Sequence, residues 1–304
     1  MEGPGVSRAS AGARRVTIVM AIAAAVTGIA VAPALAPPDA HAAKGKKKKG
    51  ELRTATATAT AAGAFVPATA VANCPKGTKV LAGGYTTSLP SIPNNWLNIY
   101  ESQRGSQRSW RVSGVQVFAG SATLTAYAYC QPLKAKVVAR SAQAALPATA
   151  NSTAVVQASC PRGTKVLSGG FVTPPANSTD AAYVSRSIAA GGSRWVVDAT
   201  RLGGAAAGNF TANVYCAGIP KVKGRTATAP VVPPVGSTHT ATTGKCPKGL
   251  GTGGGGFATS TPVGGLMNAA LVYETRLAGA GWSSSATPSS GTTSITLLTA
   301  AYCR

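Results

Sequence analysis

The chain is short of the residue types on which most enzyme sites depend. Its 304 residues include only 2 His and 7 Asp or Glu. Glycoside hydrolysis needs two carboxylates flanking one bond, and few acids are available to pair. His239 is the one histidine after the N-terminal segment described below, so no Ser/His/Asp set is plausible. The sequence therefore predicts a non-catalytic protein without a cofactor.

Closely spaced metal ligands and helical signals are also missing. A zinc site needs Cys or His clustered at short spacing, whereas neighbouring cysteines here are at least 30 residues apart. No stretch after the N-terminal segment combines an apolar period of 3.6 with helix caps. Only 12% of residues are charged, and Thr, Ser, Ala, Val and 36 Gly dominate the rest. This composition favours strands, and we predict no metal site.

One stretch occurs three times. Residues 74–85 read CPKGTKVLAGGY, residues 160–171 read CPRGTKVLSGGF, and residues 246–257 read a weaker CPKGLGTGGGGF. The leading cysteines are 86 residues apart at both steps. A fixed period of this kind defines repeated structural units. We predict three modules, at 53–134, 136–220 and 225–304, each an antiparallel β-sandwich built from short strands between Pro and Gly turns.

The closing strand of each module alternates between apolar and polar residues. In the first module Leu124, Ala126, Ala128 and Cys130 share one face, and the corresponding segments before Cys216 and Cys303 repeat the pattern. A cysteine facing the core needs a partner there, and equivalent cysteines recur at 56, 56 and 57 residues within a module. Six cysteines allow 15 pairings, and the repeat favours one set: Cys74–Cys130, Cys160–Cys216 and Cys246–Cys303. Such a framework is typical of an oxidising compartment.

Glycine pairs and tryptophans recur with the same period. Pairs at 83–84, 169–170 and 255–256 lie inside a predicted strand, where glycine marks a bulge or the close approach of another backbone. The expected neighbour is the Trp-bearing strand or the closing strand. Trp110, Trp195 and Trp282 alternate with polar residues in a way that favours core positions over exposed carbohydrate-stacking platforms. The literal GxGxxG at 251–256 lacks a strand before it and a helix after it, so a nucleotide site is not expected.

The N-terminus has the features of an export signal. Arg8, Arg14 and Arg15 precede an uncharged run from Val16 to Ala36, and Ala40-His41-Ala42 fits a cleavage site. We predict a signal helix within residues 1–42, with no transmembrane segment after cleavage. The alternative is an uncleaved membrane anchor. Residues 43–52 then form a basic tail that is either a passive solvated segment or a tether to surface polyanions.

Positive charge is the main functional indication. The net charge is +22, which bears on partners rather than on fold. Repeated basic loops beside the leading cysteines would present this charge several times, in the manner of linked weak sites. No nucleic-acid motif accompanies it, so specific nucleic-acid recognition is not expected. The candidate polyanion-binding residues are Lys46, Lys47, Lys48, Lys49, Lys76, Lys79, Arg162, Lys165, Lys245 and Lys248.

The pattern Cys-Pro-x-Gly-Thr, Gly-Gly-[Tyr/Phe], Trp and Tyr-Cys resembles the tandem cysteine-framed modules of secreted proteins from high-GC Gram-positive bacteria. The resemblance covers about residues 53–304, is weaker in the third module and implies location and fold, not an activity. The expected function is weak multivalent binding to anionic cell-envelope polymers or other extracellular polyanions. The alternative is a carbohydrate-binding or adhesive protein using exposed aromatics. Whether the modules form separate beads or a pseudo-threefold assembly stays open.

Overall fold

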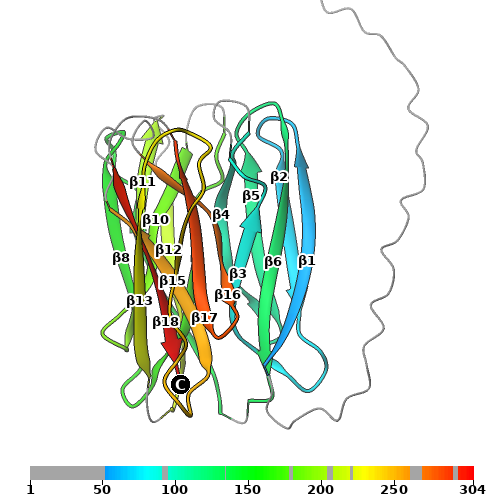
Figure 1. The fold of residues 1–304 in the computed structure, drawn as a ribbon, viewed down its shortest axis with the longest axis vertical. Coiled ribbons are helices and arrows are strands. Elements are labelled where there is room, and N and C mark those ends of the chain that lie inside the picture. Colours follow the sequence, from blue (N-terminus) through cyan, green and yellow to red (C-terminus); the bar gives the residue numbers. More distant parts are fainter. Residues whose placement is uncertain are drawn as a thin grey trace, which may run out of the picture. The chain divides into compact units, whose positions relative to one another are not determined.

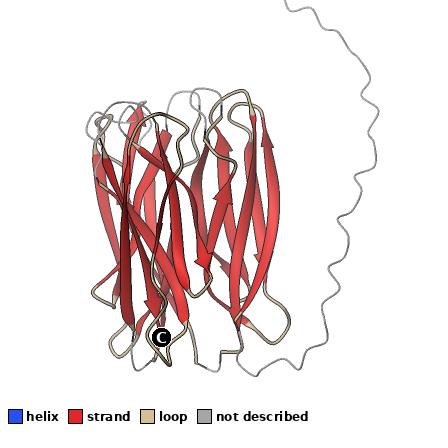
Figure 2. Cartoon of the chain, in the orientation of Figure 1, coloured by secondary structure: helices blue, strands red, loops and turns tan. Residues whose placement is uncertain are grey.

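The computed structural model describes residues 52–90, 95–133, 135–177, 181–203, 208–219, 222–260, 269–289 and 294–304. These residues form strands and connecting segments without a helix, as Figure 2 shows. None of them belongs to a helix that is long and apolar enough to cross a membrane. The predicted signal segment, the lysines at 46–49 and the rest of the tail up to Glu51 lie outside the described residues.

Among the described residues each module contributes six strands, which Figure 1 draws. Module 1 contains β1 (Arg53–Ala62), β2 (Pro67–Asn73), β3 (Lys79–Thr87), β4 (Leu97–Ser106), β5 (Ser109–Gln116) and β6 (Ser121–Gln131). Module 2 contains β7 (Val138–Ala145), β8 (Thr153–Ser159), β9 (Lys165–Val172), β10 (Ala181–Ala190), β11 (Arg194–Gly203) and β12 (Asn209–Ala217). Module 3 contains β13 (Lys223–Val231), β14 (His239–Thr242), β15 (Thr252–Thr259), β16 (Ala270–Ala278), β17 (Gly281–Pro288) and β18 (Ile295–Cys303).

Within a module the six strands form two layers of three. In module 1 one layer has the order β1-β6-β3 and the other has the order β2-β5-β4, all antiparallel. The predicted alternation in the closing strand is confirmed, because Leu124, Ala126 and Ala128 are buried between these layers. Trp110 is also buried there and packs with the same apolar cluster. The fold is therefore all-β and built from disulfide-closed antiparallel sandwich modules.

The modules are joined edge to edge into a closed ring. The three six-stranded sheets have the orders β1-β6-β3-β16-β17-β14, β13-β18-β15-β10-β11-β8 and β2-β5-β4-β9-β12-β7. Each sheet therefore takes one layer from each of two modules, and the joining pairs are β3 with β16, β9 with β4, and β15 with β10. Since each module shares a sheet with both others, the arrangement is pseudo-threefold. All the described residues fall in one compact unit.

The three modules point the same way along their strands. The joining pairs are antiparallel, so the start of β3 lies at the same end as the finish of β16, and the other two junctions repeat this. The disulfides Cys74–Cys130, Cys160–Cys216 and Cys246–Cys303 all lie at this end, which we call the cysteine end. They are the pairs that the spacing predicts.

The two glycines of each pair have different tasks. A Cβ built on Gly83 would overlap the ring of Trp110, and Gly169 and Gly255 face Trp195 and Trp282 in the same way. For the first glycine of each pair, the neighbour is therefore the Trp-bearing strand of the same module, as predicted. A Cβ on the second glycine, Gly84, would instead overlap the backbone oxygen of Thr275 in β16. The neighbour of the second glycine is thus a strand of another module, which the sequence does not indicate.

The tyrosine before each closing cysteine fastens one module to the next. The hydroxyl of Tyr129 accepts a hydrogen bond from the backbone N–H of Leu277 in module 3, at 2.8 Å. Tyr215 and Tyr302 accept the equivalent bonds from Arg104 and Ala189, at 2.9 and 2.6 Å. Each of the three rings also lies edge-on against a tryptophan of the neighbouring module. These contacts place Arg104, Ala189 and Leu277 at equivalent positions.

Candidate anion-binding end

The predicted basic loops are tight turns at the cysteine end. In the first two turns the N–H of Thr78 and of Thr164 donates to the oxygen of the proline three residues earlier, at 3.1 Å in each case. Gly77 and Gly163 have φ of +83° and +80°, a conformation that side chains rarely adopt. These turns bring the intervening residues, Lys76 and Arg162, to the surface. The third turn, at 247–250, closes in the same way and leaves Lys248 exposed.

Other cations join these residues at the same end. Arg53, Arg194 and Lys223 open strands β1, β11 and β13 there, and Arg304 follows β18. The cations of the cysteine end among the described residues are Arg53, Lys76, Lys79, Arg104, Arg108, Lys136, Arg140, Arg162, Lys165, Arg194, Lys223, Arg225, Lys245, Lys248 and Arg304. The lysine run at 46–49 ends four residues before Arg53 in the sequence.

The opposite end has almost no positive charge. Its connections, 63–66, 88–96, 117–120, 146–152, 173–180, 204–208, 232–238, 260–269 and 289–294, contain no Lys or Arg in the sequence. Arg201, in β11, lies near that end and donates to the backbone oxygens of Pro147 and Ala148 at 3.1 and 2.9 Å. Charge is therefore distributed along the strand axis, with the cations gathered at one end.

The described carboxylates lie within strands, each beside an arginine. Glu101 is 3.7 Å from Arg111, Asp198 is 2.7 Å from Arg186, and Glu274 is 3.3 Å from Arg276. Burial raises the pKa of Asp198, although the hydrogen bond and charge of Arg186 lower it. Glu101 and Arg186 hold equivalent positions after the bulges of β4 and β10, so the acid and the arginine exchange strands between modules 1 and 2.

These carboxylates do not form a catalytic pair or a metal site. Each lies in a different sheet and is paired with an arginine rather than with a second carboxylate. No group of three or more His, Cys, Asp or Glu side chains in the described part of the chain could hold a metal ion. The side chains of the described acids accordingly form ion pairs in the sheets, and no Asp or Glu side chain among the described residues lies beside the cations of the cysteine end.

A small cavity opens at this end between module 1 and the segment that leads into module 2. It has a volume of about 170 Å³ and is lined by Lys79, Arg104, Gln107, Lys136 and Val137. The Arg104 guanidinium lies 5.2 Å from the centre of the Tyr215 ring and donates to the backbone oxygen of Gln107 at 3.1 Å. Burial lowers the pKa of Arg104, and the Tyr215 hydroxyl opposes this effect. Three cations thus border one cavity without a lining acid.

The tryptophans offer no surface for stacking a sugar. Trp110, Trp195 and Trp282 are 1% exposed, and their indole N–H groups donate to Ser102, Ser187 and Thr275 at 3.2, 3.0 and 2.8 Å. Trp96 is also buried, at 4%. The prediction that the tryptophans of the three modules are core residues is confirmed.

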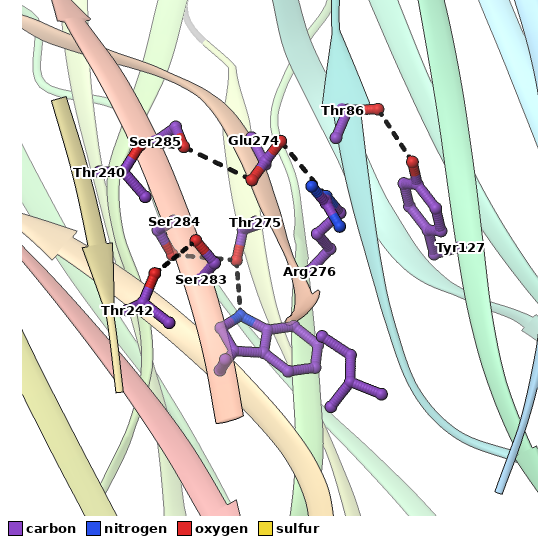
Figure 3. Close-up of polar contacts among 12 residues, drawn as sticks. Thr86, Tyr127, Thr240, Thr242, Glu274, Thr275, Arg276, Ser283, Ser284 and Ser285 are labelled. Atoms are coloured by element: carbon purple, nitrogen blue, oxygen red, sulfur yellow. Dashed lines mark hydrogen bonds and ion pairs between the residues drawn. The ribbon is translucent and has the colours of Figure 1, made fainter. Parts of the chain in front are cut away.

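A hydroxyl-rich face does occur on the sheet that modules 1 and 3 share. Figure 3 shows Thr240 beside Ser285 and Thr242 beside Ser283, with hydroxyl separations of 2.9 and 3.0 Å. Glu274 accepts from Ser285 on the same sheet. Farther along lie Thr86 and the half-exposed Tyr127, whose hydroxyls are 3.3 Å apart, and the threonines at 54, 56, 58 and 60 are exposed on β1.

The structure brings the predicted cations Lys76, Lys79, Arg162, Lys165, Lys245 and Lys248 to one end of the ring. Lys46, Lys47, Lys48 and Lys49 lie outside the described residues. Sequence reasoning missed Arg104 and Lys136, which border the cavity with Lys79. The available signal was a departure from the repeat, because Arg104 stands where the other modules have Ala189 and Leu277.

Compared with known proteins, the chain matches no protein-family model and no curated protein sequence.

Proposed function

We propose that this is a secreted, non-catalytic protein that binds anionic polymers of the cell envelope weakly, through several basic sites at its cysteine end. The observation that carries the proposal is the separation of charge along the ring. The cations gather at the end that carries the three turns, whereas each described carboxylate lies beside an arginine within a sheet. Three disulfides are compatible with an extracellular location.

The geometry suits a flexible linear polyanion. The turns present Lys76, Arg162 and Lys248 from three modules on one surface. A polymer held by one turn is then at high local concentration near the others, which raises the total affinity without a strong individual site. Binding of this kind weakens as salt screens the charges, since exposed charges interact over about 8–10 Å at physiological ionic strength.

The test is retention of the purified chain on isolated cell walls across a salt series, with and without their anionic polymers stripped. We expect retention to fall steeply between low and moderate salt and to be lost on stripped walls. The double variant K76Q/R162Q should elute at clearly lower salt than the wild type. The matched control R140Q/R225Q removes the same charge at the same end but outside the turns, from exposed positions on the outer strands β7 and β13. It should shift elution less if the turns carry the binding. Retention that ignores both salt and stripping excludes the proposal.

A second candidate is carbohydrate binding on the hydroxyl-rich face of Figure 3. Its support is the half-exposed Tyr127 together with the exposed threonines of β1 and β14, beside which Ser283 and Ser285 are buried. A sugar stacked on a tyrosine and held by hydroxyls depends little on ionic strength. Salt-insensitive retention that the variant Y127A abolishes would favour this candidate over the basic end.

A further inference from the structure

We infer that the cavity bordered by Lys79, Arg104 and Lys136 is a specific site for one phosphate group of an anionic polymer. This inference rests on the proposed function and assigns it a chemistry and a location. The rest of the cysteine end consists of exposed side chains around turns, whereas this cavity is hollowed between module 1 and the entry to module 2.

The first support is the break in pseudo-threefold symmetry at Arg104. The backbone N–H at this position donates to a tyrosine hydroxyl in all three modules, from Arg104, Ala189 and Leu277. Alanine and leucine make this bond without a charged side chain. The guanidinium of Arg104 is therefore not required for the junction, and its presence in one module indicates a local task.

The second support is the cost of placing a cation there. Burial lowers the pKa of Arg104, which means that the site disfavours its charged form relative to water. The Tyr215 ring offsets part of this cost through a cation–π contact. Lys79 and Lys136 add like charges, and no described carboxylate lines the cavity. An anion between the three cations would give all of them a partner of opposite charge.

The third support is the match of size and donors. A cavity volume of about 10–15 Å³ holds one water, so about 170 Å³ admits a group of several heavy atoms. An arginine presents two parallel N–H donors to a phosphate, and a lysine adds a compact point charge. Three cations on different segments suit a tetrahedral group with oxygens on several sides. A planar carboxylate would satisfy the arginine alone.

The test is calorimetric titration of the purified chain with inorganic phosphate at constant ionic strength, with chloride as the balancing anion. We expect one saturable site. R104A and R104L, which carry the residues of modules 2 and 3, should weaken it about ten-fold or more, because they remove a charged hydrogen-bonding group. R104K should retain part of the affinity. The control R225A loses one charge on an exposed strand position outside the cavity and should stay within two-fold of the wild type.

A competition experiment separates this inference from the proposed function. Polyphosphate should displace the chain from cell walls at a lower charge concentration than a polycarboxylate, and R104A should remove that preference while salt-sensitive retention persists. Absence of saturable phosphate binding, or equal binding by R104A, overturns the phosphate site and leaves general polyanion binding intact. Loss of salt-sensitive retention in the wild type overturns the proposed function itself.

Discussion

Tyr129 of module 1 lies edge-on against Trp282 of module 3, with ring centroids 5.4 Å apart and an interplanar angle of 73°. Trp282 fills the space that Gly255 leaves in the core of its own module. One tyrosine therefore touches the core anchor of a neighbouring sandwich while its hydroxyl binds the N–H of Leu277. The same relationship links Tyr215 to Trp110 and Tyr302 to Trp195. The same three tyrosines thus contact the core of a neighbouring module and form the hydrogen bonds at the junctions of the ring.

Replacing Tyr129 by phenylalanine should destabilise the ring by about 1–3 kcal/mol, because the partly buried N–H of Leu277 loses its acceptor. Urea unfolding followed by tryptophan fluorescence measures this difference. The control is Y127F, two residues away on the same strand, where the half-exposed hydroxyl can exchange Thr86 for water. Equal stability of Y129F and Y127F would contradict the role assigned to the Tyr129 hydroxyl.

Gly84→Ala should be among the most damaging single substitutions in the chain. The added methyl group would overlap the backbone of Thr275, which cannot rotate away as a side chain can. Overpacking a buried site costs about 1–3 kcal/mol or more, and here it would push apart the β3–β16 junction. The comparison is Gly224→Ala, where no atom lies within 4 Å of the new Cβ. Thermal unfolding followed by circular dichroism should show a clearly lower melting temperature for G84A and an unchanged one for G224A. Equal melting temperatures of the two variants would refute this account.

Removing a disulfide should cost about 2–5 kcal/mol, since the cross-link restricts the unfolded chain. The separation is 56, 56 and 57 residues in the three modules, so C74A/C130A, C160A/C216A and C246A/C303A should lose similar amounts. Guanidinium titration of each double variant against the wild type gives the values. A loss below about 1 kcal/mol in any module would show that its sheets, not the cross-link, set its stability.

Alkaline pH should unfold the ring through its tyrosines. Burial raises the pKa of Tyr129 and Tyr302 above the ordinary value of 10.0, and raises that of Tyr215 to about 12. The unfolded chain then loses these protons before the folded one does, so stability is intact below pH 10 and falls as pH rises. Each such tyrosine contributes up to about 1.4 kcal/mol per pH unit in this window. The urea midpoint should stay constant from pH 9 to about pH 10 and then decline up to pH 11. Tyrosinate absorbance of the folded and of the urea-unfolded chain, recorded over the same range, should show that the unfolded chain ionises at lower pH. A flat midpoint would mean that these hydroxyls are not buried in solution.

Several features of the fold follow directly from local sequence. The alternation ending at Cys130 places that cysteine on the buried face, and the 86-residue period carries the same argument to Cys216 and Cys303. Trp110 and its counterparts are core residues because their neighbours alternate with them on a strand. Each of these inferences depends on which face of one strand a residue occupies, and a period of two encodes that face.

The joining of the modules could not be predicted from the alternation within a strand. The register of β3 on β16 links Tyr85 to Thr275, residues separated by most of the chain, and alternation does not identify a partner strand. Tyr129 alternates as a polar-face residue, yet it is only 3% exposed because another module covers it. The cavity at Arg104 escapes for the same reason, since Lys136 comes from the segment leading into the next module.

The pairing of β3 with β16 ties the first module to the last. Assembly is therefore a closure reaction, complete only when the strands of module 3 are present. A chain that lacked residues 223–304 would keep the β9–β4 junction but leave β3 and β10 as open edges. In the full chain β3 pairs with β16 and β10 pairs with β15, and by the repeat β16 corresponds to β10 and β15 to β3. The β3 edge of one shortened chain could therefore pair with the β10 edge of another, and repeated head-to-tail addition would form a ring of several copies or an open fibre. The third module, the most divergent in sequence, is the piece that closes the ring.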